Sequence, residues 1–156
     1  MIDIEVPGYK RYRFEHLVLD VNGTIAKDGK LLDGVAELLA ELRGFLDIHL
    51  VTADTHGNQE AIDNALSLKA VRISARGQAE AKLGYVESLG ADKVVAVGNG
   101  ANDRAMLERA GLGILVIGPE GSAVEALLKA DVIVPDICAA LEILTHPKRL
   151  IATLRR

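Results

Sequence analysis

The sequence predicts an α/β fold: a doubly wound parallel sheet in a three-layer, Rossmann-like arrangement. Continuous apolar runs, of which HLVLD at 16–20 is the clearest, alternate along the chain with helix-periodic segments of roughly ten residues. Such runs are typical of strands buried on both faces, and their alternation with helices indicates right-handed crossovers. The chain of 156 residues shows no linker, repeat or low-complexity tract, so we expect one domain over residues 1–156.

Each element follows from its periodicity and its turn residues. Alternation at 2–6 and 9–14 about Pro7-Gly8 predicts a small N-terminal β-hairpin. The expected sheet strands are 16–20, 46–52, 70–74, 93–98, 112–117 and 131–134. The expected helices are 33–43, 58–68, 76–89, 102–110, 121–129 and 137–145, with a basic surface helix over 147–156. Asp28-Gly29 predicts a tight hairpin turn, which leaves no room for a cap domain at this point.

Composition and charge limit the partners. The net charge of −4 argues against an electrostatic nucleic-acid or membrane-surface binder, and the aromatic content of 3% argues against stacking platforms for single strands. The single cysteine, Cys138, excludes an intramolecular disulfide and a cysteine zinc cluster. No apolar run is long enough to span a bilayer, and the N-terminus lacks a signal-peptide core. We therefore expect a soluble, cytoplasmic protein with no nucleic-acid or membrane partner.

Polar residues directly follow three of the expected strands. These are Asp20, Thr52 and the segment Gly98-Asn99-Gly100-Ala101-Asn102-Asp103. Ligands of parallel sheets bind beyond the carboxyl ends of the strands, so these side chains are expected to meet at one site. Asp20 could serve as a metal ligand, a nucleophile or a helix cap. The hairpin expected after Asp20 removes the helix that a cap would need.

The order of these residues resembles the four motifs of the haloacid dehalogenase superfamily. The matching residues are Asp20-Val21-Asn22-Gly23-Thr24, the strand-ending Thr52, Lys82 and the segment 98–103. Within the superfamily, the chain looks closest to soluble, capless phosphatases related to the phosphorylation domain of P-type ATPases, over residues 14–135. The resemblance implies a Mg²⁺-dependent phosphatase that acts through an aspartyl-phosphate on a phosphorylated small molecule or macromolecule.

The resemblance also implies a role for each motif residue. Asp20 would be the nucleophile, Thr52 would bind the transferring phosphoryl oxygens, and Lys82 would neutralise their charge. Mg²⁺ would be held by Asp20, Asn22 (through its backbone carbonyl), Asn99 and Asp103. Substrate contacts are expected from Gly23, Thr24, Ala53, Asp54, His56 and Asn102. Phosphoryl transfer independently requires such groups, because cations must stabilise the charge on its oxygens and Mg²⁺ prefers hard oxygen ligands.

Two positions depart from the family pattern. The family usually has Asp where this chain has Asn22, and that Asp protonates the leaving group and then activates water. The fourth motif of the family usually begins Gly-Asp, whereas this chain has Gly98-Asn99. An amide can carry out neither proton transfer, and it carries one charge less toward Mg²⁺. A phosphoryl-binding or regulatory module with little turnover is therefore a second hypothesis for the function. A metal-independent dehalogenase with the same nucleophile is a third hypothesis.

Plainer explanations exist for some of these residues. Lys82 could be a solvated surface lysine, Asp103 a helix cap, and Thr52 simply the end of a strand. The order of the motifs favours the catalytic interpretation of all three. His49, inside an expected buried strand, is interpreted as a core histidine whose ring is hydrogen-bonded.

The expected cleft is open. Thr52 and Lys82 are 30 positions apart, and one helix, one strand and half a helix occupy that span, so no cap domain fits there either. An open cleft admits bulky phosphates or is covered by a neighbouring subunit. We therefore expect a homo-oligomer, with the hairpin over 2–14 as a plausible contact.

Overall fold

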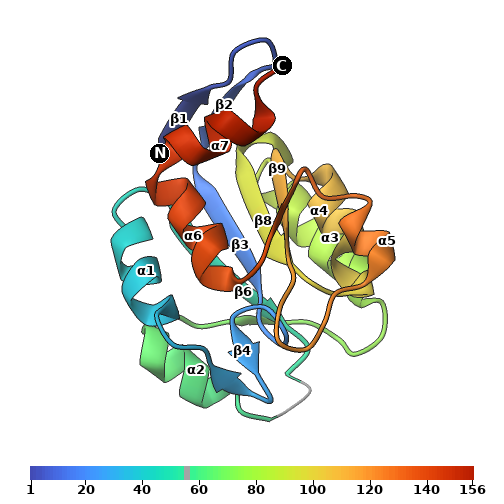
Figure 1. The fold of residues 1–156 in the computed structure, drawn as a ribbon. Coiled ribbons are helices and arrows are strands. Elements are labelled where there is room, and N and C mark those ends of the chain that lie inside the picture. Colours follow the sequence, from blue (N-terminus) through green and yellow to red (C-terminus); the bar gives the residue numbers. More distant parts are fainter. Residues whose placement is uncertain (55–56) are drawn as a thin grey trace.

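A six-stranded parallel sheet forms the centre of the computed structural model, which describes residues 1–54 and 57–156 (Figure 1). From one edge to the other, the strands are β10 (Val132–Val134), β9 (Leu112–Val116), β8 (Val94–Gly98), β3 (His16–Asp20), β6 (Asp47–Thr52) and β7 (Val71–Arg72). Along the chain, β3, β6 and β7 form one half of the sheet from its centre to one edge. The strands β8, β9 and β10 then form the other half, again from the centre outward. The doubly wound parallel sheet is confirmed, and its switch point lies between β3 and β8.

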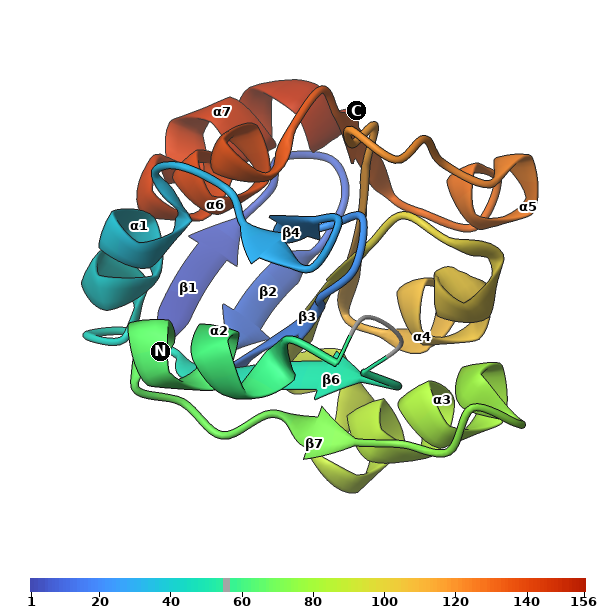
Figure 2. The same ribbon diagram turned by 90° about the horizontal axis from the view of Figure 1, so that it is seen from below.

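Helices cover both faces of the sheet and make it the middle of three layers (Figure 2). One face packs against α1 (Val35–Leu42), α2 (Gln59–Leu66) and α6 (Ile137–Thr145). The other face packs against α3 (Gln78–Ser88), α4 (Arg104–Arg109) and α5 (Val124–Leu127). Leu17 and Leu19 of β3 enter the first core, whereas Val18 enters the second. The HLVLD run is apolar without a break because β3 has a core on each side.

An antiparallel hairpin lies at one end of the molecule, beside the C-terminal helix. Its strands are β1 (Ile2–Glu5) and β2 (Arg11–Phe14), and the helix is α7 (Pro147–Leu154). Tyr12 and Phe14 on its inner face are buried in the core of this chain. The opposite face carries Asp3 and Arg11, both exposed. The subunit contact expected through residues 2–14 stays a prediction. Because the inner face of the hairpin is buried in this chain, such a contact would use the charged outer face.

A second hairpin follows β3 directly. Its strands are β4 (Ala26–Lys27) and β5 (Lys30–Leu31), which pair antiparallel. Asp28 and Gly29 in its turn have φ of 51° and 77°, the left-handed backbone that a type I′ turn requires. The tight turn expected at Asp28-Gly29 is confirmed.

Most elements match the expected ones to within a few residues at their ends, and three depart further in extent or in kind. The helix expected at 102–110 begins as the 3-10 turn η2 (Ala101–Asp103). The strand expected at 70–74 is reduced to β7. A further 3-10 turn, η1 (Ala91–Lys93), precedes β8. The helix expected at 121–129 is reduced to α5. Its first residues form a loop because Gly121 has φ of 85° and the Ala123 N–H donates to the Asn99 carbonyl at 2.9 Å.

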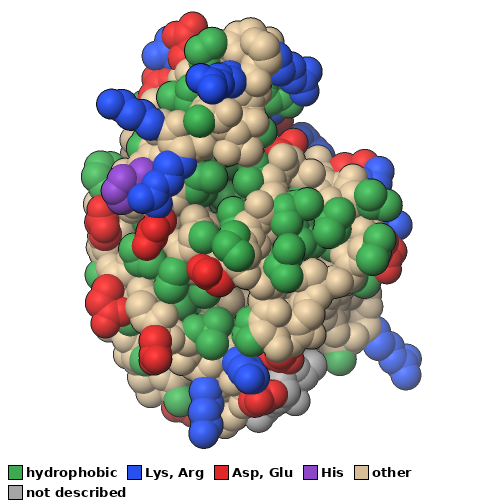
Figure 3. All heavy atoms as spheres, in the orientation of Figure 1, with side chains coloured by type: hydrophobic (Ala, Val, Ile, Leu, Met, Phe, Trp, Pro, Cys, Tyr) green, Lys and Arg blue, Asp and Glu red, His purple; other side chains and the backbone are tan. Residues whose placement is uncertain are grey.

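The surface in Figure 3 carries acidic and basic side chains interspersed with apolar ones. Exposed apolar side chains include Val124 and Leu128 at α5 and Ile133 on the edge strand β10. Among the helices of the described residues, none has both the length and the apolar composition needed to cross a membrane.

Candidate active site

The predicted motif residues converge at the carboxyl ends of three neighbouring strands, at the switch point of the sheet. Asp20 is the last residue of β3, Thr52 is the last residue of β6, and Asn99 follows β8 directly. A pocket of about 150 Å³ opens over them. Its lining consists of Asp20, Asn22, Thr52, Ala53, Gln78, Asn99, Gly100 and Asn102. This is the position at which doubly wound sheets bind their ligands.

A buried lysine bridges two aspartates beside this pocket. Lys82 Nζ donates to Asp20 Oδ1 at 2.7 Å and to Asp103 Oδ1 at 2.6 Å. The side chains of Lys82 and Asp103 are 1% and 0% exposed. A charge buried at this depth is tolerated only when it is paired and hydrogen-bonded, and Lys82 has two such partners. Lys82 is therefore not a solvated surface lysine, because α3 directs it inward.

Burial and charge set the protonation of this cluster. Burial raises the pKa of Asp20 to about 7, the charge of Asp103 acts in the same direction, and Lys82 opposes both. Burial alone would lower the pKa of Lys82, but the two carboxylates outweigh burial and hold that pKa above its usual value. Lys82 therefore remains positively charged and supplies a fixed cation at the pocket.

Asp103 also shapes the loop that follows β8. Its Oδ2 accepts hydrogen bonds from the backbone N–H groups of Asn99 at 3.0 Å and Gly100 at 2.9 Å. A Cβ atom at Gly98 would lie 2.5 Å from Asp103 Cγ, so this close approach requires glycine. The side chain of Asp103 makes no cap hydrogen bond to α4, the helix that follows it. One carboxylate oxygen instead pairs with Lys82, and the other holds the loop after β8.

Thr24 and Asn99 surround the second oxygen of Asp20. Thr24 Oγ1 lies 3.1 Å from Asp20 Oδ2 and 3.0 Å from Asn99 Oδ1. Its hydroxyl has a single proton, so it donates a hydrogen bond to only one of these oxygens at a time. Asn99 Nδ2 donates to the Gly121 carbonyl at 2.9 Å. Because that carbonyl only accepts, the amide oxygen of Asn99 is the atom that faces Thr24. Asn99 thus turns an oxygen, and not an N–H group, toward the Asp20 side of the site.

The predicted substrate-contact residues do not all reach the pocket. Ala53 and Asn102 line it. Thr24 is fully buried, and a Cβ atom at Gly23 would lie 2.5 Å from Asn99 Nδ2. Neither Gly23 nor Thr24 is among the described residues of the lining, so the structure places both behind the pocket surface.

Asp54 lies on the loop after β6. The Asp54 carboxylate accepts a hydrogen bond from the Gln59 N–H at 3.2 Å, and the Asp54 N–H donates to Thr52 Oγ1 at 3.0 Å. Asp54 therefore holds the start of α2, and it is not one of the described residues that line the pocket. His56 lies outside the described residues.

Gln78 lines the pocket although no sequence motif indicated it. It is the first residue of α3, and its Oε1 accepts a hydrogen bond from Asn102 Nδ2 at 2.5 Å. Gln78 precedes Lys82 by four residues, so the two side chains share one face of the helix. That spacing from the motif lysine is the signal that could have identified Gln78.

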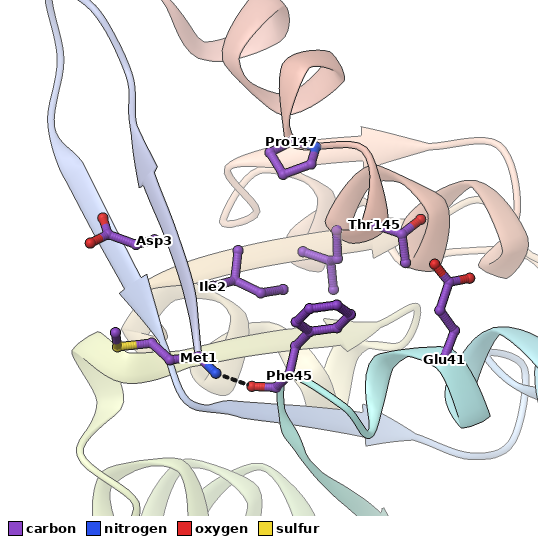
Figure 4. Close-up of a pocket in the computed structure, with 8 residues that line it drawn as sticks. Met1, Ile2, Asp3, Glu41, Phe45, Thr145 and Pro147 are labelled. Carbon is purple, nitrogen blue, oxygen red and sulfur yellow. Dashed lines mark hydrogen bonds between the residues drawn. The ribbon is translucent and has the colours of Figure 1, made fainter.

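A second hollow, of about 270 Å³, lies among the N-terminal strand, the end of α1 and the junction of α6 with α7 (Figure 4). The residues around it include Ile2, Asp3, Glu41, Phe45 and Pro147. The Met1 ammonium donates to the Phe45 carbonyl at its side. None of the described motif residues lines this hollow, so the pocket over Asp20 is the candidate active site.

Several proteins are similar to this chain. An uncharacterized protein of Methanocaldococcus jannaschii is 44% identical over 79 residues, which are 48% of this chain and 85% of that protein. The structure of 3-deoxy-D-manno-octulosonate 8-phosphate phosphatase from Moraxella catarrhalis, with magnesium, phosphate and KDO, matches with a TM-score of 0.64 at 17% identity, over 91% of this chain and 94% of that one. The cobalt-bound deoxy-D-mannose-octulosonate 8-phosphate phosphatase from Haemophilus influenzae has a TM-score of 0.67 at 10% identity, over 92% and 94%. At these identities the two structures show a shared fold.

A family model described as haloacid dehalogenase-like hydrolase matches residues 4–111. The matched region exceeds half of the chain and contains Asp20, Thr52, Lys82 and Asp103, one residue from each of the four motifs. The resemblance seen in the order of those motifs is thereby confirmed. The chain belongs to the haloacid dehalogenase-like hydrolase family.

Proposed function

We propose that this hydrolase is a phosphatase that transfers a phosphoryl group from its substrate to Asp20 and then to water. The observation that carries the proposal is the buried Lys82, whose Nζ lies 2.7 Å from Asp20 beside the pocket. A carboxylate that attacks an anionic phosphate needs a fixed positive charge next to it, and Lys82 supplies one. The phosphatases among the structures of similar fold support the same class of reaction.

In the first step, an oxygen of the Asp20 carboxylate attacks phosphorus while the bond from phosphorus to the leaving oxygen breaks. Lys82 stabilises the charge on the phosphoryl oxygens, and the Thr52 hydroxyl donates a hydrogen bond to them. The electron pair of the broken bond departs with the leaving oxygen, which needs a proton unless it is weakly basic. Asn22 is an amide and cannot supply that proton, so weakly basic leaving groups are favoured.

In the second step, water attacks phosphorus, inorganic phosphate departs, and the Asp20 carboxylate is regenerated. The attacking water must lose a proton, and the amide of Asn22 cannot accept it. This step should therefore limit turnover for every good substrate. A burst of leaving group equal to the enzyme sites should precede a slow steady state.

The same edge of the sheet offers hard oxygen donors of the kind that Mg²⁺ prefers. The proposed ligands are the carboxylates of Asp20 and Asp103, the amide oxygen of Asn99 and the backbone carbonyl of Asn22. Among the described residues no cluster of three or more His, Cys, Asp or Glu could hold a metal ion, so the site depends on two carboxylates. Two carboxylates suffice for Mg²⁺, which keeps several waters. When bound, the cation would screen Asp20 from the anionic substrate.

A phosphoryl-binding module with little turnover is the second candidate function. The observation that favours it is Asn22, which lines the pocket beside the nucleophile but cannot transfer protons. In such a module, Asp20 would become phosphorylated once and then remain so.

Release of phosphate from p-nitrophenyl phosphate in the presence of Mg²⁺ tests the proposal. The wild type should release phosphate, and Asp20→Asn should not, because an amide is too weak a nucleophile. Asp92→Asn, which alters a side chain that is 93% exposed, is the matched control and should keep the wild-type rate. No release above Asp20→Asn across a broad panel of phosphate esters would overturn the phosphatase. Stable, stoichiometric labelling by acetyl phosphate without turnover would favour the binding module.

A further inference from the structure

The described lining of the active-site pocket is uncharged apart from the nucleophile. Among the described residues that line it, Asp20 has the only charged side chain. Lys82 lies next to Asp20 but is 1% exposed, and its ammonium group is bonded to two carboxylates. The rest of the lining consists of amides, one hydroxyl and small residues: Asn22, Thr52, Ala53, Gln78, Asn99, Gly100 and Asn102. Apart from Asp20, the described lining that a leaving group would meet is therefore polar and neutral.

Gln78 and Asn102 form a hydrogen-bonded pair within this lining. Gln78 Nε2 donates to the Ala75 carbonyl at 3.1 Å, and Gln78 Oε1 accepts from Asn102 Nδ2 at 2.5 Å. Because the Ala75 carbonyl only accepts, this chain of bonds fixes the orientation of both amides. Each amide nitrogen has a second N–H group, and each amide oxygen has a further lone pair. The pair can thus donate and accept hydrogen bonds, but it offers no charge.

Both members of the pair are fixed to the charged cluster. Gln78 lies one helical turn before Lys82 on α3, and Asn102 directly precedes Asp103 in η2. A group that contacts the pair is therefore held at a set position relative to the Lys82–Asp103 bond, and so relative to the phosphoryl site.

We propose that Gln78 and Asn102 determine substrate specificity by selecting a neutral, hydroxyl-bearing leaving group over one that carries a carboxylate. The inference rests on the phosphatase function proposed above. A hydroxyl both donates and accepts, so the amide pair satisfies it fully. A carboxylate that contacts the amide pair would lose water there without meeting a cation, because the described lining holds no Lys or Arg and Lys82, beside Asp20, is 1% exposed.

Two phosphate esters that differ at one carbon test the inference. Glycerol 3-phosphate has a hydroxymethyl group where 3-phosphoglycerate has a carboxylate. Each is measured as a competitive inhibitor of p-nitrophenyl phosphate hydrolysis by the wild type, so neither has to be turned over. The inhibition constant of glycerol 3-phosphate should be lower by about tenfold or more. Equal constants, or a preference for 3-phosphoglycerate, would overturn the inference.

Variants of Gln78 test whether this residue discriminates between the two esters. Gln78→Arg adds a cation to the pocket and should reduce the ratio of the two constants to about threefold or less, or reverse it. Glu80→Gln makes the same change in net charge at an exposed residue of α3, and it should keep the wild-type ratio. Gln78→Met, which is similar in length but cannot form these hydrogen bonds, should weaken glycerol 3-phosphate more than 3-phosphoglycerate. A wild-type ratio in both Gln78 variants would overturn the role of Gln78.

The assay also separates this inference from the proposed function. Hydrolysis of p-nitrophenyl phosphate without discrimination between the two esters would retain the phosphatase and overturn the specificity role. Absence of hydrolysis above the Asp20→Asn background, for all phosphate esters, would overturn both.

Discussion

Strands β3 and β6 meet a polar cluster at each end, and the two clusters differ in charge and in access. At the carboxyl end, Lys82 joins two buried aspartates below a pocket. At the amino end, His16 Nδ1 lies 3.2 Å from His49 Nε2, and His49 Nδ1 lies 2.8 Å from the Tyr85 hydroxyl. Helix α3 contributes a residue to each cluster, Lys82 to the first and Tyr85 to the second.

The difference shows what distinguishes a candidate active site from other polar clusters on the same strands. At the amino end, both ring nitrogens of His49 are hydrogen-bonded, as interpreted from the sequence, but the residue is half-buried and not part of the core. None of the described residues that line the pocket comes from this end. At the carboxyl end, Gly23 and Gly98 let the loops approach the polar side chains closely. The proposed chemistry rests on a buried cation between carboxylates with an opening beside it, rather than on polar residues alone.

The largest expected effect comes from breaking the carboxyl-end cluster. Lys82→Met leaves Asp20 and Asp103 buried without the cation between them, so it should lower the free energy of unfolding by about 3–5 kcal/mol. Phosphate release should be lost as well, because no fixed positive charge remains at the phosphoryl site. Urea unfolding followed by circular dichroism measures the first effect, and the p-nitrophenyl phosphate assay measures the second.

Lys93→Met is the matched control for Lys82→Met. Lys93 lies 3.0 Å from Glu15, but the two side chains are 55% and 41% exposed. Exposed ion pairs contribute about 0–1 kcal/mol, so this variant should remain close to the wild type. Equal destabilisation by the two substitutions would contradict the distinction between the buried cluster and a surface pair.

The carboxyl-end cluster also shows how far the sequence could predict the site. Asp20, Thr52 and Asp103 were expected at one edge because a parallel sheet brings the carboxyl ends of its strands together. The burial of Lys82 could not follow from its own segment, since lysine on a helix is normally solvated. Its partners Asp20 and Asp103 lie 62 and 21 positions away. Only the order of the motifs connected them before the structure did.

Contacts between distant segments explain what the sequence could not predict. The helix expected at 121–129 is shortened by bonds from this segment to Asn99, which local periodicity does not contain. Gln78 joins the pocket pair through Asn102, 24 positions along the chain. Asp54 lies two positions after the motif residue Thr52, yet its carboxylate bonds to the start of α2. Periodicity predicted the strands and most helices, but it could not predict side-chain pairings across them.

The second largest effect is expected from a substitution that gives the carboxyl-end cluster the acid–base group that it lacks. Asn22→Asp places in the pocket lining a carboxylate that can carry protons. General acid–base catalysis typically contributes about 10²–10⁴-fold, so the steady rate of phosphate release should rise by roughly tenfold or more and the burst should shrink. Rapid-mixing measurement of p-nitrophenolate records both phases. Asn64→Asp, at an exposed residue of α2, controls for the added charge. A burst-free wild type with an indifferent Asn22→Asp would show that another group already acts as the base.

A third, smaller effect concerns the charge of the proposed metal site. Asn99→Asp adds a carboxylate there and should lower the Mg²⁺ concentration for half-maximal activity by about fivefold. The same change removes the bond from Asn99 Nδ2 to the Gly121 carbonyl, so it should cost about 1–2 kcal/mol of stability after Mg²⁺ is removed with EDTA. Mg²⁺ titrations and urea unfolding in EDTA measure the two effects. Unchanged results in both would contradict the position given to Asn99.

The smallest expected effect lies at the amino end. Burial lowers the pKa of His49, the neighbouring His16 acts in the same direction, and Asp47 opposes them. Tyr85 faces the ring from α3 through its hydroxyl. As the pH falls through the ordinary histidine value of 6.5, the unfolded chain takes up a proton here before the folded chain does. Stability should therefore fall with pH in the range below about 6.5.

The size and the test of this effect follow from the partial exposure of His49. Solvent screens a half-buried group, so the loss between about pH 7.5 and about pH 5.5 should be less than about 1 kcal/mol. Urea midpoints at the two pH values compare the wild type with His49→Gln, whose neutral amide cannot take up the proton and should make stability less sensitive to pH. His146→Gln, at an exposed residue before α7, should match the wild type. Carboxylates titrate alike in all three chains, so the difference isolates the His49 ring. An equally steep loss in His49→Gln would mean that His49 does not link folding to pH.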